Sequence, residues 1–108
     1  PQIENGRPVG MELDRSGNLL VADTHYYRVL VFTPLGKLLE ERTIGGTEGK
    51  EPGQFGFVTD CVQDQDGNYY VAEYGENDRI QKFLADPTPV ETATWGGLKL
   101  RWAGDAPE

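Results

Sequence analysis

The chain has 108 residues, with 18 acidic and 10 basic side chains and a formal net charge of -8. This charge repels phosphate backbones, and no apolar run approaches the roughly 20 residues that a membrane span needs, so we expect neither a nucleic-acid nor a membrane partner. A single cysteine, Cys61, excludes an internal disulfide. With a single histidine, His25, as well, the sequence predicts no metal site and no cofactor.

Short apolar runs separated by turn residues predict an all-β chain without a long helix. The predicted strands, in chain order, are residues 9–13, 19–23, 28–32, 37–44, 58–63, 69–73, 79–84 and 90–95. The first turn contains Gly17 and Asn18, which both tolerate a positive φ. The run 37–44 is predicted as a strand that ends at Gly45, although residues 38–41 alone would also fit a helix.

The residues around the first turn recur later in the chain. Residues 14–22 (DRSGNLLVA) match residues 64–72 (DQDGNYYVA) at an offset of 50, with five of the nine positions identical. One inserted residue then moves the offset to 51, at which residues 28–29 match residues 79–80. A repeat of this length with four strands per unit is typical of a propeller blade, which is a four-stranded antiparallel sheet placed radially around a channel.

Five segments of the chain carry a recognisable pattern. They are residues 8–14 (PVGMELD), 17–23 (GNLLVAD), 28–32 (RVLVF), 45–49 (GGTEG) and 52–55 (PGQF). Together they resemble the NHL repeat and the linker that leads into its next blade. The second unit departs from the family pattern, with Val58 where proline is usual and Glu73 where aspartate is usual. The resemblance implies a β-propeller, commonly of about six blades, that serves mainly as an interaction platform.

This interpretation divides the chain into two blades and their connections. The predicted parts are blade one at 7–46, an inter-blade linker at 47–56, blade two at 57–97, and a tail or lead-in to a next blade at 98–108. Leu13, Val21, Val29 and Phe32 are expected to pack one blade against its neighbour. Two blades would each leave one face uncovered, so we expect the propeller to be completed either by further blades or by oligomerisation in a head-to-tail ring.

Two pairs of opposite charges occupy matching places in the two units. Asp23 is paired with Arg28, and Glu73 is paired with Arg79. Because the pattern recurs, we favour ion pairs that brace the loop between the second and third strands of each blade. The alternative is that these groups belong to a binding face.

The loops before the third strands differ most between the two units, and loops carry binding functions more often than strands do. The candidate binding residues, in these loops and in the predicted channel, are His25, Tyr26, Tyr27, Asp60, Glu76, Asn77 and Asp78. A histidine flanked by tyrosines can stack on a partner and form hydrogen bonds with it. Alternatively, the loops only cover the blade edge, and Asp60 is part of a solvated channel wall.

Two further motifs are interpreted as structural. Residues 64–68 (DQDGN) begin like a calcium loop, but the twelfth position, where an acidic ligand is needed, is Gly75. The flanking residues are also typical of strands, so a turn is predicted. Cys61 is expected to be a small buried apolar residue and not an activated thiol.

The functional hypothesis is a non-catalytic binding scaffold that contacts a protein or peptide partner through loops at one rim, its acidic charge favouring basic partners. One alternative is that the chain supplies structural blades to a propeller enzyme of the amidating-lyase or lactonase type. Those lyases hold zinc with histidines at places where this chain has Pro8 and Val58. The sequence predicts no catalytic residue, and it favours a protein that is not an enzyme. A third possibility is a repeat unit whose only property is self-assembly into a ring.

Overall fold

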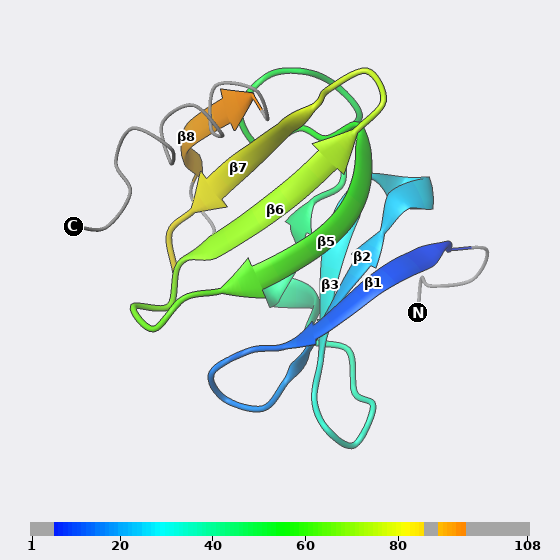
Figure 1. The fold of residues 1–108 in the computed structure, drawn as a ribbon. Coiled ribbons are helices and arrows are strands. Elements are labelled where there is room, and N and C mark those ends of the chain that lie inside the picture. The colour runs from blue at the N-terminus through cyan, green and yellow to red at the C-terminus, as the bar shows by residue number, and fades with distance from the viewer. Residues whose placement is uncertain (1–5, 86–88, 95–108) are drawn as a thin grey trace.

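The computed structural model describes residues 6–85, and the backbone of residues 89–94. The described chain is all-β and forms two antiparallel sheets (Figure 1). Sheet one has the order β1-β2-β3-β4, with β1 at Pro8–Leu13, β2 at Leu19–Asp23, β3 at Arg28–Phe32 and β4 at Ile44–Gly45. Sheet two has the order β5-β6-β7-β8, with β5 at Phe57–Gln63, β6 at Tyr69–Tyr74, β7 at Arg79–Phe83 and β8 at Pro89–Thr94.

Seven of the eight predicted strands lie within one residue of the observed bounds at each described end. The alternation of apolar and polar residues and the turn signals between the runs explain this agreement. Residue 95, the end of the predicted second blade at 97, and the predicted tail 98–108 lie outside the described residues. Within the described chain, no helix is long and apolar enough to cross a membrane.

The predicted strand 37–44 is wrong over most of its length. Leu38 forms an isolated bridge with Phe32, and the chain then turns through a short 3-10 helix, η2, at Glu40–Arg42. Only its last residue, Ile44, is in a strand, β4. Three consecutive charged residues do not provide the alternation that a strand requires. In addition, the Arg42 guanidinium donates a hydrogen bond to the Tyr69 hydroxyl at 3.1 Å, which ties this turn to sheet two.

The main core lies where the two sheets pack against each other. It consists of buried side chains from both sheets and the connecting segment: Leu20, Ala22, Val29, Val31, Ile44, Phe55, Val58, Cys61, Tyr69, Val71 and Phe83. β5 packs against β1 and β2, as Figure 1 also shows. A Cβ at position 10 of β1 would collide with the Thr59 carbonyl oxygen of β5, so Gly10 permits this contact between the sheets.

Of the four residues predicted to pack between blades, only Val29 lies in the core between the two described sheets. Leu13 is 64% exposed, Phe32 is half-buried, and Val21 is buried outside that core. Leu13, Val21 and Phe32 therefore do not pack between the two described sheets. Side chains alternate between the two faces of a strand, and the observed pairing register places these three on the face opposite to Val29.

Candidate binding site

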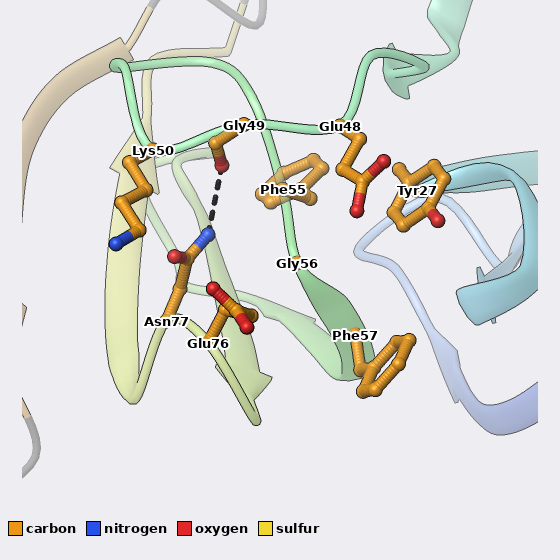
Figure 2. Close-up of a pocket in the computed structure, with 9 residues that line it drawn as sticks. All are labelled: Tyr27, Glu48, Gly49, Lys50, Phe55, Gly56, Phe57, Glu76 and Asn77. Atoms are coloured by element: carbon orange, nitrogen blue, oxygen red, sulfur yellow. Dashed lines mark hydrogen bonds between the residues drawn. The ribbon is translucent and has the colours of Figure 1, made fainter.

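A pocket of about 330 Å³ lies where the connection between the sheets meets the loops at one end of both sheets (Figure 2). We call it the linker pocket. Its lining residues are Tyr27, Glu48, Gly49, Lys50, Phe55, Gly56, Phe57, Glu76 and Asn77. They come from the loop before β3, from residues 48–57, and from the loop between β6 and β7, so the pocket requires both sheets.

Phe55 fixes the connecting segment in the core. Its side chain is fully buried, and its ring centroid lies 5.7 Å from that of Phe83 in sheet two. The segment folds back on itself, because the Phe55 N–H donates to the Thr47 carbonyl at 3.0 Å and the Gly49 N–H donates to the Phe55 carbonyl at 3.1 Å. This turn places Glu48 and Gly49 at the pocket wall.

Tyr27 has a positive φ of 56°, a conformation uncommon for a residue with a side chain. It ends the short 3-10 helix η1 at Thr24–Tyr26, and its carbonyl accepts a hydrogen bond from the Gly46 N–H at 2.8 Å. Gly45 makes this arrangement possible, since a Cβ there would collide with the Phe55 ring. The loop conformation therefore depends on Gly45 and Gly46, at the end of sheet one.

Glu73 is the centre of a buried polar network below the linker pocket. Its side chain is 0% exposed and accepts a hydrogen bond from Arg79 Nε at 2.7 Å. It also accepts from the Gly56 N–H at 2.9 Å, from Asn77 Nδ2 at 3.0 Å and from Gln81 Nε2 at 2.8 Å. These donors compensate the burial of the carboxylate, which would be costly without them.

The same network holds the connecting segment against sheet two. Arg79 donates to the carbonyls of Lys50 at 2.6 Å and Gln54 at 2.8 Å. Gln81 donates to the Gln54 carbonyl at 2.7 Å, and Asn77 donates to the Gly49 carbonyl at 2.8 Å (Figure 2). The predicted Glu73–Arg79 pair is present, and it braces the linker as well as its own loop.

The predicted pair in sheet one is also present. Asp23 is 2% exposed and accepts a hydrogen bond from Arg28 Nε at 3.0 Å. It accepts a second one from the Arg7 N–H at 2.8 Å. In both sheets the carboxylate therefore accepts from an arginine at the start of the third strand, β3 or β7. It also accepts from the backbone N–H of the residue just before the first strand, β1 or β5.

The structure brings only some of the predicted binding residues together. Tyr27, Glu76 and Asn77 line the linker pocket, and Asn77 is buried. His25 and Tyr26 are outside the lining and form an edge-to-face ring pair with centroids 4.6 Å apart.

Two of the predicted acidic residues also lie outside the pocket lining. Asp78 accepts a hydrogen bond from the Gly75 N–H at 3.1 Å and so shapes the loop between β6 and β7. Asp60 is exposed on β5 next to Gly10.

Sequence reasoning missed the contribution of the connecting segment. Glu48, Lys50, Phe55 and Phe57 all line the linker pocket, whereas the sequence pattern predicts no binding role for them. Two aromatic residues two positions apart, preceded by charged residues, were the available signal. Their roles differ in the tertiary structure. Phe55 is buried between the sheets and anchors the connecting segment, whereas Phe57 is 44% exposed at the pocket wall.

The charge and the aromatic rings of the linker pocket suit a cation. Two carboxylates, Glu48 and Glu76, and one ammonium group, Lys50, leave a net negative charge among the lining side chains. Figure 2 shows Tyr27 and Phe57 on the same side of the pocket, with Glu48 next to Tyr27. Aromatic faces and carboxylates both attract a positively charged group.

The motif at 64–68 forms a turn, as predicted. One Asp64 carboxylate oxygen accepts hydrogen bonds from the N–H groups of Asp66 and Asn68, each at 2.9 Å, and the other accepts from the Tyr70 hydroxyl at 3.0 Å. Desolvation raises the pKa of Asp64, but these hydrogen bonds together lower it below its usual value. Desolvation and the hydrogen bond to Asp64 raise the pKa of Tyr70.

Across the described residues, no group of three His, Cys, Asp or Glu side chains could hold a metal ion.

Cys61 is buried in the core, as predicted, and its thiol is expected to be unreactive. Desolvation, with a smaller contribution from Asp60, raises the pKa of Cys61 to about 12. At pH 8 the thiolate fraction is then roughly 1,000-fold lower than for an exposed cysteine.

We expect iodoacetamide to label Cys61 in the folded protein far more slowly than in the urea-unfolded protein, as followed by mass spectrometry. Equal labelling rates would contradict the buried position.

No family model matches the chain, and no curated protein matches it. The solved structures that are similar to it include two from Bacteroides species. A protein of unknown function from Bacteroides caccae gives a TM-score of 0.61 at 18% identity over 80% of this chain and 28% of its own. A candidate exported protein from Bacteroides fragilis gives 0.62 at 21% identity over 82% of this chain and 24% of its own. The chain spans about a quarter of the length of both proteins, and the likeness concerns the fold alone.

Proposed function

We propose that the chain forms two NHL-type blades of a β-propeller and acts as a non-catalytic scaffold that binds a protein or peptide partner at the linker pocket. Two four-stranded antiparallel sheets that follow a repeat of 50 to 51 residues support the blade assignment. Their face-to-face packing and the similarity to a part of two longer chains also support it.

One observation carries the binding proposal. The linker pocket is lined by the loop before β3, the connecting segment and the loop between β6 and β7, and therefore exists only because the two units are stacked. It contains three of the residues that the sequence marked as candidates: Tyr27, Glu76 and Asn77. Loops held on a rigid sheet scaffold are a common location of binding sites.

The chemistry of the pocket selects a basic side chain as the group that enters it. A lysine or arginine side chain brings an aliphatic stem, which packs on Tyr27 and Phe57, and a positive charge, which Glu48 and Glu76 attract. Lys50 at the pocket wall is itself positively charged, so it disfavours a partner that brings two basic side chains into the pocket. The partner is therefore expected to present one basic residue in an exposed peptide segment.

Titration with a short blocked peptide that contains one central lysine tests this proposal. Chemical-shift changes in NMR spectra should concentrate at Tyr27, Phe57 and Glu76, and matched peptides with norleucine or glutamate in place of the lysine should bind more weakly. Glu48→Gln and Glu76→Gln should each reduce affinity by about two- to five-fold, because each removes one charge interaction at a partly exposed site.

The control is Glu40→Gln, which removes one negative charge at an exposed residue of η2, outside the linker pocket. It should leave the affinity for the lysine peptide unchanged. If Glu40→Gln weakens binding as much as Glu76→Gln does, only the net charge attracts the peptide. That result, or equal affinity for the lysine and glutamate peptides, would refute the pocket assignment.

A further inference from the structure

Each sheet has one face that does not pack against the other sheet. The outer face of sheet one carries the cross-strand neighbours Met11, Leu13, Leu19, Val21, Leu30 and Phe32. The outer face of sheet two carries Val62, Tyr70, Ala72, Ile80 and Lys82. Cross-strand partners project from the same side of a sheet, so the pairing register defines both faces.

The sequence repeat relates the outer face of sheet one to a face that is covered in sheet two. At the offset of 50, Met11 corresponds to Cys61, and Val21 corresponds to Val71. Cys61 and Val71 lie in the core between the sheets, where Cys61 is 2% exposed. Met11, at the corresponding place, is 64% exposed. In sheet one, therefore, the Met11 position lacks the partner sheet that its counterpart has.

The converse relation holds for the outer face of sheet two. Its residues Tyr70, Ala72, Ile80 and Lys82 correspond to Leu20, Ala22, Val29 and Val31. These four residues of sheet one are between 0% and 1% exposed, because sheet two covers them. Their four counterparts in sheet two are only half-buried. Each chain thus has two uncovered surfaces, the outer faces of sheet one and sheet two. They correspond by the repeat to the two surfaces that pack together between its own sheets.

We propose that two copies of this chain associate through their outer faces. The outer face of sheet one in one copy packs on the outer face of sheet two in the other. The contact repeats the packing of sheet two on sheet one and is head-to-tail, so each copy keeps one free half for the next. Apolar side chains such as Met11 and Leu13 become buried on Ala72 and Ile80. A second copy is the occupant because the chain itself supplies both complementary surfaces.

One position makes the contact between copies weaker than the contact within the chain. Gly10 allows the Thr59 carbonyl to approach sheet one closely, whereas the corresponding residue in sheet two is Asp60, which is exposed. The incoming strand must therefore lie farther from β5 than β5 lies from β1. We expect the association to depend on protein concentration, so that monomers predominate in dilute solution.

Light scattering coupled to size-exclusion chromatography over a range of concentrations tests the proposal. The unmodified chain should form species heavier than one chain. The double variant Met11→Asp and Leu13→Asp blocks one half of the interface, and Ala72→Glu blocks the other, so each should remain monomeric. The control Leu35→Asp, at a 98% exposed position in a turn, should associate like the unmodified chain.

Mixing the two blocked variants gives the decisive result. Each retains the half that the other lacks, so the mixture should form a species with twice the mass of one chain and no larger species. Circular dichroism of each variant alone verifies that it is folded. A monomeric unmodified chain at the highest concentration, or a folded mixture that stays monomeric, would overturn the proposal. Association of the double variant with itself would overturn it as well.

Discussion

Glu73→Ala should lower the free energy of unfolding by about 3–5 kcal/mol, since it removes one partner of a buried ion pair. The Glu73 carboxylate is fully buried and is bound by Arg79, Gln81, Asn77 and the Gly56 N–H. Without it, the Arg79 guanidinium loses its counter-charge, and the Gly56 N–H loses its acceptor. Urea unfolding followed by circular dichroism, at one fixed protein concentration, measures the change.

Two further variants make this result interpretable. Glu73→Gln keeps one carbonyl acceptor and most of the side-chain shape, so the loss should be smaller than for alanine. Glu40→Ala, at an exposed position of η2, should change the unfolding free energy by less than about 0.5 kcal/mol. If Glu73→Ala proves as mild as Glu40→Ala, the network below the linker pocket does not stabilise the fold.

Phe55→Ala should cost about 3–5 kcal/mol, because it creates a cavity where the connecting segment enters the core. The Phe55 ring is fully buried, lies 5.7 Å from the Phe83 ring, and touches the position of Gly45. Its loss should also loosen the pocket wall formed by Glu48 and Gly49. Accordingly, urea unfolding should shift to lower concentration, and affinity for the lysine peptide should fall.

Phe57→Ala is the matched comparison, since it truncates the same side chain two residues away. The Phe57 ring is 44% exposed, so the expected loss of stability is only about 1 kcal/mol. Both variants should weaken peptide binding, but only Phe55→Ala should strongly destabilise the chain. Equal destabilisation by the two would mean that Phe55 does not anchor the linker between the sheets.

Local patterns predicted the strands because each pattern has a direct structural cause. The motif around Gly17 and its counterpart around Gly67 mark the turns, and both glycines have a positive φ. The strand predicted at 37–44 was wrong because the conformation of these residues depends on a residue distant in the sequence. Arg42 donates a hydrogen bond to Tyr69 in sheet two instead of continuing a strand. No pattern within that run could indicate a partner in the other sheet.

The candidate site was predicted only in part. Variation between the two loops pointed to Tyr27, Glu76 and Asn77, which do line the linker pocket. Their companions Glu48 and Phe57 come from segments with no local signal for binding. The charge pattern also led to the two ion pairs, but not to the four donors that meet at Glu73.

By itself, the sequence determined an all-β chain with two repeated units, because strand alternation, turn glycines and an internal match are properties of short segments. Only the tertiary structure decided which face of each sheet is covered. An apolar residue such as Met11 or Cys61 has the same local pattern in both units, yet one is exposed and the other is buried. Burial depends on which surfaces are in contact, and contacts between distant segments are fixed by the packing of whole sheets.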